Sequence, residues 1–115
     1  MDGVVLRAGE GEALFGGRIV LKATFEQLCI TESLFPDARD GAEPHYHRHH
    51  ADSFYVLDGE VDFLVGDEWM RLPAGSFVAA PIGITHAFGN LDGQRARLLN
   101  IHAPSTGFHD RLRGF

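Results

Sequence analysis

Hydrophobic and polar residues alternate along most of this chain, in short runs bounded by glycine, proline or aspartate. Because the side chains of a strand point to its two faces in turn, a period of two predicts strands rather than helices. Turn signals recur every roughly eight to twelve residues, a spacing typical of an antiparallel sandwich or barrel. The expected strands are Val4–Leu6, Arg18–Thr24, Glu26–Leu34, Phe54–Leu57, Val61–Val65, Trp69–Leu72, Phe77–Ala80, Thr85–Phe88 and Arg95–Ala103.

Two turns and one helical segment complete the pattern. Asp58-Gly59-Glu60 signals a β-hairpin between neighbouring strands, since glycine takes positive φ without strain. A second turn lies at Gly66-Asp67, and only Thr106–Gly114 has the spacing of a helix. The stretch Glu26–Leu34 carries Leu28, Ile30 and Leu34 on one face and Gln27, Cys29, Thr31 and Ser33 on the other. We expect a single all-β domain over residues 1–115 with a short C-terminal helix.

Charge and composition narrow the classes of function. The chain of 115 residues carries a net charge of −6 and its arginines are dispersed, which argues against a nucleic-acid partner. No run approaches the ~20 apolar residues of a membrane span and the N-terminus lacks a signal pattern, so we expect a cytoplasmic protein with no membrane partner. The single cysteine, Cys29, excludes an internal disulfide and is expected to be a small buried hydrophobe.

Histidines gather in two segments that indicate a metal site. His45 and His47 are two residues apart, so both imidazoles project to the same side of a strand. Asp52 follows them, and His86 lies in a separate segment framed by proline and glycine, Pro81-x-Gly83-x-x-His86-x-x-x-Asn90. A His-rich turn alone is explained equally well by a solvated loop, but the separate setting of His86 favours a metal. Imidazole and carboxylate ligands suit Fe, Mn, Ni, Cu or Zn.

These segments resemble the two motifs of the cupin superfamily. The second motif matches in full, at Gly75, Pro81, Gly83, His86 and Asn90, and the first matches at His45, His47 and Gly59. Two positions depart from the pattern: Gly41 is closer to the histidines than the family has it, and Asp52 replaces a glutamate. The resemblance implies an antiparallel double-stranded β-helix, the jelly-roll or cupin barrel. It also implies a set of metal ligands, His45, His47, Asp52 and His86.

Asp52 decides how such a metal would be held. Aspartate is one methylene shorter than glutamate, so its oxygen reaches about an ångström less far, against metal–oxygen bonds of ~2.0–2.2 Å. Three arrangements are open: direct coordination, coordination through a water, or a three-histidine site with open positions. We predict direct or water-mediated coordination, because Asp52 has the right charge and the right register with Gly59.

The other histidines have alternative interpretations. His49 continues the i, i+2 series of His45 and His47, so it would be a fourth possible ligand if the strand persisted. Because the chain should be turning there, His49 and His50 are expected at the rim or surface. His102, on the last expected strand, could orient a metal ligand or act as a pocket acid–base group, and is our candidate catalytic residue. A hydrogen-bonded core or rim histidine is an equally good interpretation of His102. His109 is expected to be solvated.

Aromatic residues and one asparagine are assigned to the framework. Asn90 is expected to be a structural hydrogen-bonding residue. Four phenylalanines are expected to pack the core rather than line the cavity, because a small barrel needs aromatic side chains to fill it. These are Phe54, Phe63, Phe77 and Phe88.

Function is less constrained than fold, because one fold hosts many reactions. The chain resembles small cupins often compared with quercetin-type dioxygenases, which implies one divalent metal ion and a mononuclear-metal oxidoreductase of the dioxygenase kind. Its substrate would be a small oxygen-rich organic molecule held in the barrel. The alternatives are a metal-dependent isomerase or lyase and a non-catalytic small-molecule binding or storage protein. We also expect a homodimer, common among cupins, in which Val4–Leu6 covers a strand edge of the second copy.

Overall fold

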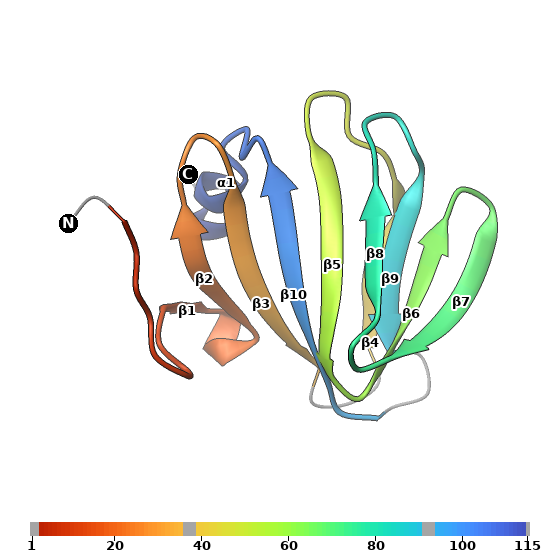
Figure 1. The fold of residues 1–115 in the computed structure, drawn as a ribbon, viewed down its shortest axis with the longest axis horizontal. Coiled ribbons are helices and arrows are strands. Elements are labelled where there is room, and N and C mark those ends of the chain that lie inside the picture. The colour runs from red at the N-terminus through yellow and green to blue at the C-terminus, as the bar shows by residue number, and fades with distance from the viewer. Residues whose placement is uncertain (1–2, 36–38, 91–93, 115) are drawn as a thin grey trace.

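Two antiparallel sheets pack face to face in the computed structural model, which describes residues 3–35, 39–90 and 94–114 (Figure 1). Within these residues the larger sheet has the strand order β1-β2-β3-β10-β5-β8 and the smaller sheet has the order β4-β9-β6-β7. The expected all-β jelly-roll barrel with a short C-terminal helix is confirmed. No helix in this part of the chain has the length and apolar character needed to cross a membrane.

Ten strands form in the described residues, and all but Glu12–Leu14 and Arg39–His45, which were not predicted, correspond to a predicted range. They are β1 (Glu12–Leu14), β2 (Ile19–Thr24), β3 (Cys29–Phe35), β4 (Arg39–His45), β5 (Ala51–Asp58), β6 (Glu60–Val65), β7 (Glu68–Pro73), β8 (Phe77–Ala80), β9 (His86–Asn90) and β10 (Ala96–Ala103). A 3-10 turn, η1 (Phe15–Gly17), follows β1, and the helix α1 (Phe108–Arg113) follows β10.

The chain crosses between the sheets at most of its turns. Among the described strands from β3 to β10, only β6 and β7 are consecutive members of one sheet. The hairpin predicted at Asp58-Gly59-Glu60 is therefore wrong, because β5 lies in the larger sheet and β6 in the smaller one. Gly59 has a φ of 73°, and a Cβ there would overlap the carbonyl oxygen of Arg95, so glycine is needed for this passage between sheets. The turn at Gly66-Asp67 does join a hairpin, since β6 pairs with β7.

The predicted strand Val4–Leu6 does not form in this single chain. The edge of the larger sheet next to β2 is taken by β1 instead, so the earlier segment has no partner strand. Its three side chains are 50%, 75% and 40% exposed. Val4 and Leu6 lie along a groove on the outer face of the larger sheet, together with Leu28, Ile30 and Leu99. The apolar side of the 26–34 stretch therefore faces outward, and Cys29 and Thr31 face the interior.

The apolar core fills one end of the space between the sheets. Its buried members are Phe35, Phe54, Val56, Val61, Phe63, Val78, Ala96 and Leu98, with Phe88 packed against them. Full burial of each large apolar side chain stabilises the fold by about 1.5–3 kcal/mol. Phe54 and Phe63 pack the core as predicted, but the prediction for Phe77 is wrong, since it is 60% exposed. It lies on the edge strand β8, where the neighbouring Val78 points inward instead.

Candidate metal centre

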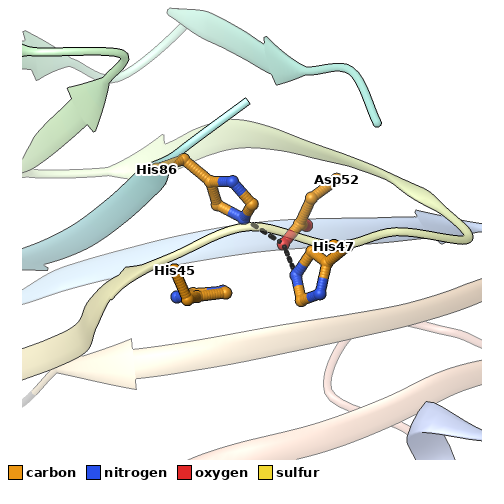
Figure 2. Close-up of side chains that lie close together, drawn as sticks. All are labelled: His45, His47, Asp52 and His86. Carbon is orange, nitrogen blue, oxygen red and sulfur yellow. Dashed lines mark hydrogen bonds and ion pairs between the residues drawn. The ribbon is translucent and has the colours of Figure 1, made fainter. Parts of the chain in front are cut away.

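Four side chains from different parts of the chain meet inside the barrel (Figure 2). They are His45 at the end of β4, His47 in the loop that follows, Asp52 on β5 and His86 at the start of β9. One potential ligand atom from each lies within 4.8 Å of all the others. Antiparallel pairing places His45 directly opposite His86, and Asp52 approaches from the larger sheet. We call this cluster the metal centre.

Asp52 lies at the middle of the hydrogen bonds in the centre. Its Oδ2 is 3.0 Å from Nε2 of His86 and 3.2 Å from Nε2 of His47. Its Oδ1 is 3.1 Å from Nε2 of His102 and accepts a hydrogen bond from the Asn100 amide. The carboxylate therefore reaches the histidines although it is one methylene shorter than a glutamate. Asn100 and His102 fix one oxygen, so that the other faces the centre.

Backbone carbonyls set the tautomers of two of the histidines. Nδ1 of His45 is 2.6 Å from the carbonyl oxygen of Glu43, and Nδ1 of His86 is 2.9 Å from that of Ile84. A carbonyl oxygen only accepts hydrogen bonds, so both Nδ1 atoms carry protons. In a neutral ring the lone pair is then on Nε2, the nitrogen that a metal would use.

The contact between His86 and Asp52 requires a positive charge. Burial acts to raise the pKa of Asp52, but hydrogen bonds from His102 and His86 hold it below its ordinary value, so the group is ionised near neutral pH. Burial acts to lower the pKa of His86, but the bonds to Asp52 and Ile84 raise it overall. With Nδ1 already bonded, a neutral His86 would turn a lone pair towards the carboxylate oxygen. Either a second proton on His86 or a cation must lie there, and three imidazoles with one carboxylate suit a divalent metal ion.

A cavity of about 430 Å³ opens beside the centre. His45, His47, Asp52, Asn100 and His102 supply polar groups to its wall. The rest of the wall is mostly apolar and is made by Ile19, Thr31, Ser33, Phe88, Phe108 and Leu112. This mixture of a mainly apolar wall and a few convergent polar groups is typical of sites for small organic molecules.

His50 does not lie where the sequence indicated. It was expected at the rim, but it is only 4% exposed, whereas its neighbour His49 is exposed as predicted. Its ring stacks on His47 with centroids 3.9 Å apart, and its Nδ1 is 3.0 Å from the hydroxyl oxygen of Thr106. Burial, with smaller contributions from His47 and His102, lowers its pKa to about 4. β5 begins at the next residue.

The remaining predicted residues are placed as follows. His102 is buried and bonded to Asp52, and its ring meets Phe108 edge-on with centroids 3.8 Å apart. Asn90 is fully buried and donates a hydrogen bond to the carbonyl of Gln94, which fits its expected structural role. The prediction that His109 is solvated is wrong, because its side chain is only 16% exposed.

Two residues of the site were not assigned a role from the sequence. Asn100 anchors Asp52, and period-two counting along β10 could have found it, since it shares a face with His102. Thr106 holds His50, and no sequence signal indicates that contact.

Comparisons with known proteins, by sequence and by structure, point to one protein family. The sequence profile of the Cupin domain matches residues 33–102. The quercetin 2,3-dioxygenase of Bacillus subtilis (strain 168) is 30% identical in an alignment over 106 residues that covers 87% of this chain and 31% of that protein. The chain thus spans about a third of the length of this relative.

Solved structures share the fold at lower identity. An RmlC-like cupin from Shewanella frigidimarina NCIMB 400 superposes with a TM-score of 0.71 at 21% identity, covering 84% of this chain and 86% of that one. KdgF from Halomonas sp. gives a TM-score of 0.67 at 23% identity, covering 75% and 78%. The profile match, the two-sheet barrel and these neighbours agree, and the chain belongs to the cupin family.

Proposed function

We propose that this cupin holds one divalent metal ion at His45, His47, Asp52 and His86. We further propose that it is a mononuclear-metal oxidoreductase of the dioxygenase kind, acting on a small oxygen-rich organic molecule. The convergence of the four donor groups, three of which (His45, His47 and Asp52) line the cavity, carries the first proposal. The similarity to a quercetin 2,3-dioxygenase supports the second, although this chain corresponds to only part of that enzyme.

The side chains around the cavity have separable roles in this proposal. Bound at the centre, an ion of Fe, Mn, Ni, Cu or Zn would polarise oxygen atoms of the substrate or, if redox-active, activate dioxygen. His102 lines the cavity and is the candidate group for moving a proton to or from a substrate hydroxyl. Its Nε2 contacts the carboxylate of Asp52, so His102 also touches a proposed ligand of the metal ion. Phe88 and Phe108 supply apolar surface to the same cavity, and the Phe108 ring meets His102 edge-on.

Metal analysis of the purified protein, followed by oxygen-uptake assays, tests both parts of the proposal. We expect one equivalent of metal in the wild type and loss of stoichiometric metal in His86→Ala. His49→Ala is the matched control, because His49 is an exposed histidine of the same segment. Retention of full metal content by His86→Ala would place the ion elsewhere.

Oxygen uptake with the loaded protein separates the enzymes from a storage protein. A flavonol such as quercetin and other hydroxy-carbonyl compounds serve as probes. Dioxygen consumed in step with substrate supports the dioxygenase proposal, whereas substrate conversion under anaerobic conditions indicates an isomerase or lyase. Metal-dependent binding with no turnover in either condition indicates a binding or storage protein.

We also propose that two copies associate through the outer face of the larger sheet. The groove is lined by Leu28, Ile30 and Leu99 together with charged side chains, among them Lys22, Glu32 and Arg97, and the Val4–Leu6 segment beside it is exposed. Covering this surface with a second copy would remove both from water. Sedimentation should show a dimer that Val5→Asp weakens. A monomer at micromolar concentration would contradict the proposal.

A further inference from the structure

A second group of histidines lies next to the metal centre. One nitrogen from each of His47, His50 and His102 lies within 4.8 Å of the other two. The rings of His50 and His102 meet with centroids 4.7 Å apart, and both residues are buried. Only His47 is common to this group and to the metal centre.

Thr106 determines which nitrogen of His50 carries its proton. The Thr106 hydroxyl has one proton, and it is donated to the carbonyl of Ser105 over 2.8 Å. At 3.0 Å from Nδ1 of His50 the same hydroxyl oxygen therefore accepts, so Nδ1 is protonated. In the neutral ring the lone pair is on Nε2. That atom is buried and has no hydrogen-bond partner among the described residues.

A buried acceptor without a donor is unfavourable, and the chemistry of the surroundings points to what satisfies it. Protonation of Nε2 would add positive charge beside two other imidazoles. His102 offers a lone pair as well, because Nε2 donates to the ionised Asp52 and leaves Nδ1 unprotonated in the neutral ring. Neutral imidazole nitrogens grouped in this way are ligands for Zn²⁺, Co²⁺, Ni²⁺ or Cu²⁺, and not for Mg²⁺ or Ca²⁺.

We propose that His47, His50 and His102 form a second cation site, which holds a borderline divalent ion between solvent and the metal centre. A rim pocket of about 470 Å³, lined by Tyr46, His47, Arg48, His49, His50, Thr106 and Arg111, opens beside it. A neutral imidazole has one lone pair and binds one ion with it. His47 can therefore serve only one of the two sites at a time, so an ion occupies one site or the other. The inference builds on the proposed metal centre in this respect, but it depends on different residues, His50 and His102.

Cobalt binding measured by equilibrium dialysis tests the second site with the first one removed. In His45→Ala/His86→Ala we expect one equivalent of Co²⁺ to bind, but only at concentrations far above those that saturate the wild type, so this ion is lost when a His86 variant is purified. The second site has no carboxylate, so the double variant should bind Co²⁺ more weakly than the wild type does. The loss of affinity should exceed the roughly 10–100-fold that is typical when a group supporting a metal ligand is removed. Adding His50→Gln should abolish this residual binding, and adding His49→Gln, the exposed neighbour, should leave it unchanged.

The outcomes separate this inference from the proposed function. A folded double variant that binds no Co²⁺, or residual binding that survives His50→Gln, overturns the second site and leaves the metal centre standing. Wild-type affinity that persists in the double variant but is lost in His50→Gln overturns the metal centre and supports the second site. If removal of the buried His86 prevents folding, as judged by circular dichroism, His45→Ala/His86→Gln carries the same comparison, because glutamine fills more of the space and keeps a polar group there.

Discussion

The inner faces of β5 and β10 are polar at one end of the barrel and apolar at the other. On β5, Asp52 is followed on the same face by Phe54 and Val56, all of them buried. On β10, the polar residues His102 and Asn100 share the inner face with the apolar Leu98, and all three are buried. Within a few residues, the inner face of one strand changes from polar side chains of the candidate metal site to apolar side chains that pack the core.

Strand register keeps the two regions apart. Asp52 pairs with His102, whereas Val56 pairs with Leu98, so polar residues meet polar ones and apolar residues meet apolar ones. A slip of one residue would turn every one of these side chains to the other face. The apolar end provides the burial that stabilises the barrel. At the polar end the buried side chains contact one another around Asp52, and among the described residues Nε2 of His50 is left without a hydrogen-bond partner. The comparison predicts that each end can be damaged with little effect on the other.

The largest effect is expected from Leu98→Ala. Leu98 is fully buried in the apolar end, and its truncation should lower the free energy of unfolding by about 2–5 kcal/mol. Chemical denaturation of the metal-free protein measures this. Leu99→Ala, on the opposite face of the same strand, is the control and should cost less. Loss of metal binding by a folded Leu98→Ala variant would show that the two ends are not independent.

Asp52→Asn is expected to have the next largest effect, this time on the polar end. The variant retains the shape but removes the negative charge that faces His47 and His86. Metal affinity should fall by more than the roughly 10–100-fold typical of losing an outer partner. Competition with a chelator measures the affinity. Asp52→Glu keeps the charge and should weaken binding less, and equal affinities for the two variants would rule out a charge effect.

Asn100→Ala probes the support of the carboxylate rather than the carboxylate itself. Asn100 donates to Asp52 and, over 3.0 Å, to the carbonyl of Ser53. Without it Asp52 loses one anchor, and metal affinity should fall by roughly 10–100-fold. Thr31→Val is the matched control, because Thr31 is buried in the same cavity wall directly across from Asn100. A similar loss in both variants would mean that packing, and not the hydrogen bond, is responsible.

Local patterns predicted those parts of the molecule that depend on strand periodicity. Counting by two along the sequence puts Asp52 on the same strand face as Phe54, and His102 on the same face as Leu98, and the structure buries all four. Motif spacing likewise indicated that His86 would meet the first histidine segment. The placement of these side chains follows from the alternation of strand faces, which any strand obeys.

The remaining features depend on tertiary contacts that no local pattern encodes. Whether the turn at Gly59 joins a hairpin or crosses between sheets depends on where the next strand finds its partner. His50 is buried because Thr106, distant in sequence, packs against it. Phe77 is exposed because it faces outward on β8 whereas Val78 and Ala80 face inward, and which face of this strand is the inner one depends on how the two sheets pack.

A smaller effect is expected at Cys29, which lies on the inner face of β3 next to the polar end. Burial raises the pKa of its thiol above the ordinary value, so little thiolate forms at pH 8. Reaction with a chromogenic disulfide reagent at pH 8 should be much slower in the folded protein than in urea. Equal rates in the two states would show that water reaches this part of the interior.

The smallest effect is expected from Phe77→Ser. Because Phe77 is exposed on β8, its removal should change the free energy of unfolding by no more than about 0.5 kcal/mol. Phe63→Leu, in the apolar end, provides the contrast and should cost more. A large loss in Phe77→Ser, measured by denaturation at several protein concentrations, would reveal that a second copy covers this surface.

The position of β10 between β3 and β5 determines the order in which parts of the barrel can form during synthesis. Residues paired across this strand are far apart in the chain: Arg97 bonds Glu32 across 65 positions. Contacts of such long range form slowly and only after the later segment has left the ribosome. Until residues 96–103 insert, the larger sheet is divided in two and Asp52 has neither Asn100 nor His102 beside it. The nascent protein therefore acquires its barrel and a correctly aimed carboxylate in the same late step.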